Sequence, residues 1–294
     1  MPKMTNPLRY PGGKRFLVDY IAELLRVNNL IGTTIYEPFA GSAAVSLELL
    51  NRGLVDNAVL IEKDPLIYSF WRSVIEQPEE LCTRIDEMAI NLESWNRLSH
   101  FRTLDAPLGN PLELGFAGLF FNRTNYSGII MANPLGGKGQ KSEYTLDCRF
   151  KKKRVKEQIM SVANHRNRIT VEWTDGVRYL DRNRRAITEG NHFVYVDPPY
   201  YEKGRGLYRH YFNDEDHENL AELLRASTLP WLLSYDNHPF IQDLYFGQGA
   251  RYQEFYMDSL IKSRSRGAEL LISNLEIPPV GNASRVIQAQ EAIN

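Results

Sequence analysis

Residues 192–200 constrain the fold of this chain most, because a short apolar run there ends in an acid and two prolines. A run of this length that is closed by turn residues is typical of a strand buried on both faces of a parallel sheet. Proline has a fixed φ and no amide hydrogen, so no central strand can continue past Val196. The segment therefore predicts a buried strand that ends at a sheet edge. There, Asp197-Pro198-Pro199-Tyr200 presents a carboxylate, a proline carbonyl and an aromatic ring.

Strands and helices alternate on both sides of this segment. Residues 34–37, 58–62 and 231–235 are further short apolar runs that predict buried strands. A helical pattern follows the first of them at 43–51, and another follows the central strand at 214–226. This alternation predicts an α/β fold with a doubly wound, mainly parallel sheet.

The alternation breaks down in two places. Residues 255–257 and 270–274 flank a basic loop and predict an antiparallel hairpin at one edge of the sheet. Between residues 77 and 168, amphipathic stretches, a Gly/Pro-rich segment and a basic run replace the strand–helix rhythm, which predicts a mainly helical insertion. The expected organisation is a sheet domain over 1–76 and 169–277, the insertion over 77–168 and a loose tail over 278–294.

The composition argues against several classes of protein. No stretch of 18 apolar residues is present and the first residues lack the apolar core of a signal peptide, so we expect a cytoplasmic protein without a membrane helix. Cys82 and Cys148 have no Cys or His at zinc spacing, and the six histidines are scattered. Neither a disulfide nor a metal site is therefore expected. Nothing in the composition points to a particular protein partner.

The net charge of −1 hides one strongly basic segment. Between Lys138 and Arg168 there are ten Lys or Arg residues and three acids, so the rest of the chain carries a net charge of −8. A basic segment on a mildly acidic body is what a phosphate-contacting surface requires. A solvated helix face would explain residues 151–154 equally well, and charge alone does not separate the two interpretations.

Three acids, Glu37, Glu62 and Asp197, end three of the predicted strands. Ligands of open α/β sheets bind at the carboxyl ends of the strands, where helix N-termini expose free amides. The small residues of the turn 37–44 would let backbone approach a ligand, but they do not form the G-x-G-x-x-G fingerprint of NAD or FAD folds. Glu62 lies 21 residues after Gly41, near the spacing at which an acid binds a ribose hydroxyl, although it could equally cap a helix.

The Asp-Pro-Pro-Tyr tetrad suits the chemistry of a planar amine. A base with an exocyclic NH2 group needs two acceptors for its two hydrogens and an aromatic surface on which to stack. Asp197, the Pro198 carbonyl and the Tyr200 ring meet these needs. A merely structural Pro-Pro turn is the alternative, and the apolar strand before the tetrad favours the chemical interpretation.

Together these motifs resemble the Dam-type, D12-class DNA adenine methylases, over a stretch from Leu8 to about Asn274. The resemblance implies a Rossmann-like class I methyltransferase sheet with an inserted target-recognition region. It also implies site-specific transfer of methyl from S-adenosyl-L-methionine to adenine N6 in DNA. The catalytic residues that it implies are Asp197, Pro198, Pro199 and Tyr200. The cofactor-binding residues are Tyr10, Lys14, Glu37, Pro38, Phe39, Gly41, Glu62, Asp64, Asp175 and Asp197, with Glu62 preferred to Asp64 for the ribose.

Residues 122–128 resemble the start of the family's DNA-reading segment, and the basic run follows them. The expected DNA-binding residues are Arg123, Asn125, Tyr126, Ser127, Asn133, Lys138, Lys141, Lys151, Lys152, Lys153 and Arg154. Dam itself has Asn at the position of Ser127 and Arg at that of Met131, and residues 134–138 replace its following signature. These departures leave the recognition sequence open, GATC included.

The expected substrate is an adenine flipped out of double-stranded DNA, because an adenine inside the duplex cannot reach such a site. Most of the rate would come from orientation and electrostatics. The alternatives are methylation of another planar amine, such as cytosine N4 or an RNA base, and a non-catalytic DNA-binding regulator with the same fold. The motif order and residues 122–128 favour DNA, and the presence of both Lys14 and Asp197 favours catalysis.

Overall fold

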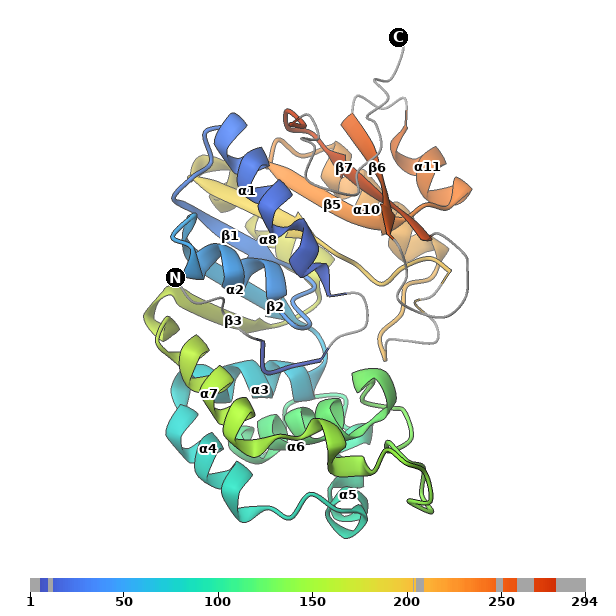
Figure 1. Ribbon diagram of the computed structural model, residues 1–294. Helices are drawn as coiled ribbons and strands as arrows, with labels where there is room; N and C mark the ends of the chain where they lie inside the picture. The colour runs from blue at the N-terminus through green and yellow to red at the C-terminus, as the bar shows by residue number, and fades with distance from the viewer. Residues whose placement is uncertain are drawn as a thin grey trace.

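A computed structural model describes residues 6–9, 13–202, 204, 209–246, 251–257 and 267–278 (Figure 1). Within them, seven strands form one sheet: β1 (Thr33–Glu37), β2 (Val55–Glu62), β3 (Ile169–Trp173), β4 (His192–Val196), β5 (Trp231–Asp236), β6 (Arg251–Met257) and β7 (Gly267–Ser273). The strand order is β3-β2-β1-β4-β5-β7-β6. Strands β1 to β5 pair in parallel, and β7 is antiparallel to both β5 and β6. The order confirms the predicted Rossmann-like α/β sheet, and the antiparallel pair of β6 and β7 forms one edge of it.

Helices cover both faces of the sheet: α1 (Val18–Val27), α2 (Ala44–Asn51), α3 (Pro65–Glu76), α8 (Gly176–Glu189), α10 (Asp214–Arg225) and α11 (Pro239–Tyr245). Strand β4 divides its side chains between the two layers. Phe193 and Tyr195 belong to the core that contains α1, α2 and α3, whereas Val194 and Val196 belong to the core that contains α8, α10 and α11. All four side chains are buried, so after the half-buried His192 the strand has no charged side chain until Asp197.

Four further helices gather at one end of the molecule, beyond the edge strand β3 (Figure 1): α4 (Pro78–Glu87), α5 (Leu92–Leu98), α6 (Pro111–Thr124) and α7 (Lys152–Ala163). Helix α6 crosses α3 at backbone contact. A β-carbon at Gly115 would lie 2.6 Å from the Ser69 carbonyl oxygen, and one at Gly118 would lie 2.5 Å from that of Leu66. The two glycines therefore permit the crossing that fixes these helices to the sheet.

Short 3-10 helices complete the described structure: η1 (Lys14–Leu17), η2 (Ser99–Thr103), η3 (Tyr126–Gly128), η4 (Leu146–Arg149) and η5 (Arg166–Arg168). Strand β3 was not predicted, because only Ile169 of its five residues is buried and no apolar run marks it. Strand β2 begins at Val55, before the predicted residue 58, because Asp56 and Asn57 are exposed and interrupt the apolar pattern. Asn213 caps α10 in a reciprocal capping box with Asp216.

Candidate active site

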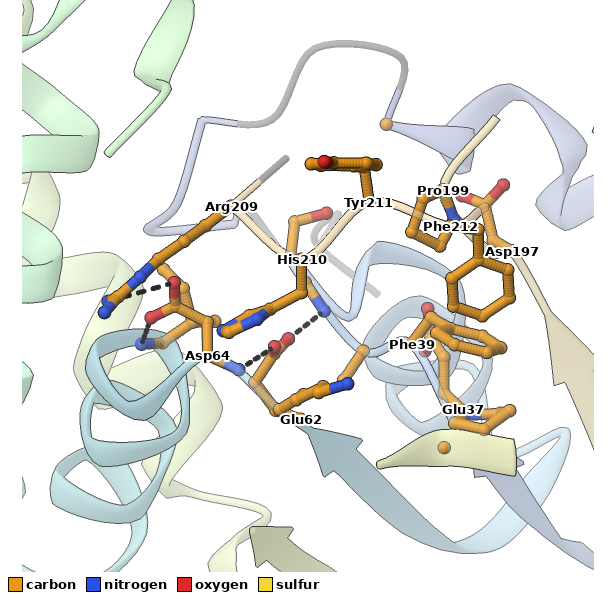
Figure 2. Close-up of a pocket in the computed structure, with 18 of the residues that line it drawn as sticks. Glu37, Phe39, Glu62, Asp64, Asp197, Pro199, Arg209, His210, Tyr211 and Phe212 are labelled. Atoms are coloured by element: carbon orange, nitrogen blue, oxygen red, sulfur yellow. Dashed lines mark hydrogen bonds and ion pairs between the residues drawn. The ribbon is translucent and has the colours of Figure 1, made fainter. Parts of the chain in front are cut away.

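A pocket opens at the carboxyl ends of β1, β2 and β4, where the strand order changes direction (Figure 2). Ligands of doubly wound sheets bind at such a crevice. Nine of the residues predicted to bind the cofactor line it: Lys14, Glu37, Pro38, Phe39, Gly41, Glu62, Asp64, Asp175 and Asp197. Tyr10, the tenth, lies outside the described residues. Of the predicted catalytic tetrad, Asp197 and Pro199 belong to the pocket wall, whereas Pro198 and Tyr200 do not.

The turn after β1 presents backbone to the pocket. Gly41 has a φ of 46°, a left-handed conformation that glycine adopts without strain. Glu37 ends the strand, is 4% exposed, and accepts hydrogen bonds from the amide and the hydroxyl of Ser46. Burial raises the pKa of Glu37 to about 8, and the bonds from Ser46 offset this only in part. The pocket thus contains a carboxyl group that a bound cation would help to ionise.

Glu62 and Asp64, the two candidates for the ribose-binding acid, have different partners. One oxygen of Glu62 accepts from the Gly41 amide at 2.9 Å and the other from the Asp64 amide at 2.8 Å. Burial raises the pKa of Glu62 to about 7. Asp64 caps α3 by accepting from the Leu66 amide at 2.8 Å. The helix-capping role that was open for Glu62 therefore belongs to Asp64, although both acids line the pocket.

Asp175 reaches the pocket from the turn between β3 and α8. Its carboxylate accepts from the Arg178 amide at 3.1 Å and lies 3.0 Å from the Lys63 ammonium group. The next residue, Gly176, packs so tightly on the β1 turn that a β-carbon there would collide with the Pro38 carbonyl. This close contact joins the two turns and explains why Asp175 lines the pocket.

Asp197 lies where β4 ends, and Ser234 and Lys14 are among the partners that hold it. The Ser234 hydroxyl donates to its carboxylate at 2.8 Å, and the ammonium group of Lys14 lies 3.8 Å from the same oxygen. Burial raises the pKa of Asp197, and the positive charge of Lys14 and the bond from Ser234 oppose that rise. Lys14, itself 4% exposed, also lies over the Tyr200 ring at 4.5 Å from its centroid. The lysine predicted to contact the cofactor is thus also a neighbour of the proposed catalytic acid.

Asp236, at the end of β5, is a site residue that the sequence analysis missed. It is 9% exposed, and its two carboxylate oxygens accept from the amides of Tyr201 at 3.0 Å and Glu202 at 2.9 Å. These bonds fix the chain directly after the predicted catalytic tetrad. The signal that could have found Asp236 is the one used for Glu37 and Glu62, an acid at the end of an apolar strand.

The segment 209–212 forms a further part of the pocket wall, in addition to the strand ends. Figure 2 shows Arg209, His210, Tyr211 and Phe212 running across the pocket from Asp64 towards Asp197. None of these four residues was predicted as a site residue from the sequence. Apolar periodicity carries no signal for a segment of this kind, because tertiary contacts alone hold it.

The predicted DNA-reading segment divides into buried and exposed residues. Arg123 donates to the Pro7 carbonyl at 2.6 Å and to the Gln158 side chain at 3.0 Å, and burial lowers its pKa to about 10. Asn125 is fully buried, accepts from Trp95 Nε1 at 2.7 Å, and donates to the carbonyls of residues 129 and 130. Both side chains hold the insertion together, so we remove Arg123 and Asn125 from the expected DNA contacts.

The other expected contacts in this segment lie nearer the surface. The Tyr126 side chain is 66% exposed and Asn133 is exposed, whereas Ser127 is half-buried with a φ of 53°. In the basic run, the exposed members are Lys138, Lys141, Lys151, Lys153 and Arg154. Lys152 differs, since its ammonium group donates to the carbonyls of Asp86 at 2.9 Å and Met88 at 2.8 Å, where α4 ends. Lys152 is therefore a helix-capping residue and is also removed from the expected DNA contacts.

The architecture and the pocket agree with what a comparison of sequences shows. The family model of the D12 class N6 adenine-specific DNA methyltransferases matches residues 10–257. The chain belongs to this family. The match confirms the resemblance, and it makes this protein an S-adenosylmethionine-dependent enzyme that methylates adenine N6 in DNA. No curated protein matches the chain in sequence.

Solved structures similar to this D12-class methyltransferase are distant from it. The protein yhhF from Escherichia coli is 12% identical, with 92% of each chain covered and a TM-score of 0.36. The rRNA methyltransferase aviRa from Streptomyces viridochromogenes is 13% identical, with 90% of this chain and 86% of that chain covered and a TM-score of 0.35. Superpositions this loose say nothing about the substrate.

The charge of the pocket fits the cofactor of the family. Six carboxyl groups line it, from Glu37, Glu62, Asp64, Asp175, Asp197 and Asp216, against three basic side chains, from Lys14, Lys63 and Arg209. S-adenosylmethionine carries a positive sulfonium and a positive amino group against one carboxylate, so an excess of acids favours its net positive charge electrostatically. None of the helices in the described part of this methyltransferase is both long and apolar enough to span a membrane.

Proposed function

We propose that Asp197 and the Pro198 carbonyl accept the two N–H bonds of a flipped adenine and so orient its N6 lone pair towards the methyl donor. The cofactor supplies an electrophilic methyl group when it is bound. The observation that carries the proposal is the position of Asp197, at the end of β4 on the wall of an acidic pocket, with Lys14 and Ser234 as fixed partners. Acceptors held in place in this way act without reorganising during the reaction.

Lys14 and Ser234 keep Asp197 able to accept. An ionised carboxylate is acceptor-only, whereas a protonated one donates through its hydroxyl and would compete with the amine hydrogens. Burial raises the pKa of Asp197, and both partners stabilise the ionised form against it. The Tyr200 ring is the proposed stacking surface for the base, and the contact with Tyr235, at 6.1 Å between ring centroids, supports a fixed ring orientation.

The proposed cofactor contacts follow the pocket wall. Glu62, with Asp64 beside it, would bind the ribose, and Asp175 would approach the adenine of the cofactor. The turn of Glu37, Pro38, Phe39 and Gly41, together with Lys14, would hold the methionine half; Tyr10 stays in the proposed set on the resemblance alone. The acid excess of the pocket supports these assignments.

The proposed DNA-binding surface belongs to the insertion 77–168, and the proposed substrate is duplex DNA. Tyr126, Ser127 and Asn133 would contact bases, while the exposed basic side chains would contact phosphates: Lys138, Lys141, Lys151, Lys153 and Arg154. Phosphate contacts position a protein on DNA, and base contacts specify the sequence. The exposure of all of these residues except the half-buried Ser127 supports the surface. The division into a sheet domain and an insertion is proposed with it, whereas residues 279–294 of the predicted tail lie outside the described residues.

The test is the variant Asp197→Ala, with Asp181→Ala, an exposed residue on α8, as the control. Loss of a charge-assisted acceptor should cost at least about 3 kcal/mol of transition-state stabilisation, or more than about 100-fold in rate. Transfer of labelled methyl to DNA and S-adenosylmethionine binding are measured on the same preparations. We expect transfer to be lost and cofactor binding to stay measurable. Near-normal transfer by Asp197→Ala would refute the proposed role.

A further inference from the structure

His210 lines the pocket and carries a ring nitrogen that has no assigned use. Its side chain belongs to the pocket wall together with Glu62 and Asp64, and Figure 2 shows its ring pointing towards Asp64. Its Nε2 atom is buried, and among the described residues it has no hydrogen-bond partner. Leaving a buried polar atom unpaired is unfavourable. A buried polar atom without a partner in a residue that lines a ligand pocket indicates a hydrogen bond that is made to the ligand.

Contacts on both sides of His210 fix its backbone. On one side, the Arg209 guanidinium donates to the Leu104 carbonyl and to the Asp105 carboxylate, the latter at 3.1 Å. The same guanidinium lies 3.9 Å from the carboxylate of Asp64. On the other side, Phe212 meets the Phe39 ring edge-on at 5.6 Å between centroids. The backbone at His210 is therefore held in place before any ligand arrives.

The chemistry of the neighbouring groups narrows the choice of ligand atom. Burial lowers the pKa of His210, and the nearby charges of Lys63 and Arg209 act in the same direction, whereas Asp64 and Asp105 oppose them. The neutral imidazole has one donor and one acceptor nitrogen. A ribose hydroxyl can serve either nitrogen, because a hydroxyl both donates and accepts. Glu62, beside it on the same wall, is the acid already proposed to bind the ribose.

We propose that His210 binds a ribose hydroxyl of S-adenosylmethionine and that Arg209 is the positioning residue that holds His210 in place. The inference rests on the proposed assignment of this pocket to the cofactor. It adds a second ribose contact from a segment that lies outside the strand ends. Arg209 also connects this contact to residues 104 and 105, which lie between α5 and α6 of the insertion.

The experiment measures binding of S-adenosylhomocysteine and of its 2′-deoxy and 3′-deoxy analogues by calorimetry. The variants are His210→Phe, which keeps a ring without nitrogen, and His210→Gln, which keeps a polar side chain. We expect His210→Phe to bind S-adenosylhomocysteine about 10-fold more weakly, and His210→Gln to lose less. On the wild-type protein, one deoxy analogue should bind more weakly than S-adenosylhomocysteine. On His210→Phe, the same analogue and S-adenosylhomocysteine should bind equally well.

This analogue comparison separates a hydrogen bond from packing. If both deoxy analogues lose as much affinity in His210→Phe as in the wild type, the ring only packs against the cofactor and the inference is wrong. If the wild-type protein does not bind S-adenosylhomocysteine at all, the proposed function itself fails. If the wild type and His210→Phe bind S-adenosylhomocysteine with equal, normal affinity, the inference about His210 is wrong, but the proposed function is not affected.

Arg209 is tested through the same measurement. Arg209→Ala should weaken S-adenosylhomocysteine binding about 5- to 10-fold and should not weaken it further when combined with His210→Phe, because the two residues act on one contact. Arg185→Ala, on the outer face of α8 with a side chain 90% exposed, is the matched control. Full additivity of Arg209→Ala and His210→Phe would show that Arg209 does not act through His210.

Discussion

The sequence predicted the residues of the pocket at the sheet edge more accurately than the surface residues of the helical insertion. Every described residue that was predicted to bind the cofactor lies on one pocket wall. In the insertion, three of the expected DNA contacts, Arg123, Asn125 and Lys152, are occupied in holding the protein together. The difference teaches that the end of a parallel strand fixes where a side chain goes, whereas a place in a helical insertion does not.

The largest expected effect is on stability, and it distinguishes two asparagines of the predicted DNA-reading segment, Asn125 and Asn133. Asn125→Ala removes the partner of Trp95 Nε1 and of two backbone carbonyls, one of them buried, so we expect the free energy of unfolding to fall by about 2–4 kcal/mol. Asn133→Ala, at an exposed position, should change it by less than about 0.5 kcal/mol but weaken DNA binding. Urea unfolding and DNA titrations measure both. Equal stability of the two variants would contradict the structural role of Asn125.

A smaller effect concerns the residue at the sheet edge that the sequence analysis missed. Asp236→Ala should lower kcat by about 10- to 100-fold, or about 1.4–2.7 kcal/mol, because the chain after the tetrad loses two charge-assisted hydrogen bonds. The KM for S-adenosylmethionine should change little, since Asp236 is not part of the pocket wall. Asp243→Ala, an exposed acid on α11, is the control. A rise in KM without a fall in kcat would argue against the positioning role.

The buried acids of the pocket predict a pH dependence that the insertion should lack. The pKa of Glu37 is about 8 when folded, above the ordinary value of 4.5, so the folded state binds more protons than the unfolded state between those limits. The contribution of Glu37 to stability is therefore largest below pH 4.5 and is lost as the pH rises towards 8. The slope is at most about 1.4 kcal/mol per pH unit.

The variant Glu37→Gln removes this titration and keeps an acceptor for Ser46. Relative to the wild type, it should gain stability as the pH rises from 5 to 8, measured by urea unfolding without cofactor. Glu218→Gln, at an exposed position on α10, should not change the pH profile. Parallel profiles for Glu37→Gln and the wild type would show that Glu37 is ionised throughout this range.

The smallest expected effects distinguish Lys152 from its neighbours in the basic run. Reversal of Lys151, Lys153 and Arg154 to Glu should weaken DNA binding on all sequences alike, and the slope of log K against log salt should become shallower by about 0.9 for each lost phosphate contact. Lys152→Ala should instead lower the free energy of unfolding by about 0.5–1 kcal/mol, because it removes a cap from α4. DNA affinity at several salt concentrations decides the first point. An unchanged slope would make the run a solvated helix face.

The sequence alone determined the strands with uninterrupted apolar runs and the acids that end them. Strand β4 was predictable because residues 193–196 are buried on both faces and form an apolar run that ends at Asp197. The order of the motifs determined the family, which the match over residues 10–257 confirms. Edge strand β3 escaped prediction because only one of its five side chains is buried.

Tertiary structure alone decided which polar side chains are free to meet a ligand. Asn125 and Asn133 are the same residue type on one segment, yet one is fully buried and the other exposed. His210 and Arg209 belong to no periodic element, and contacts with residues more than a hundred positions away along the chain hold Arg209. Strand periodicity is a local property that a sequence displays directly. The partner of a polar side chain is a non-local property, which exists only once distant segments have packed together.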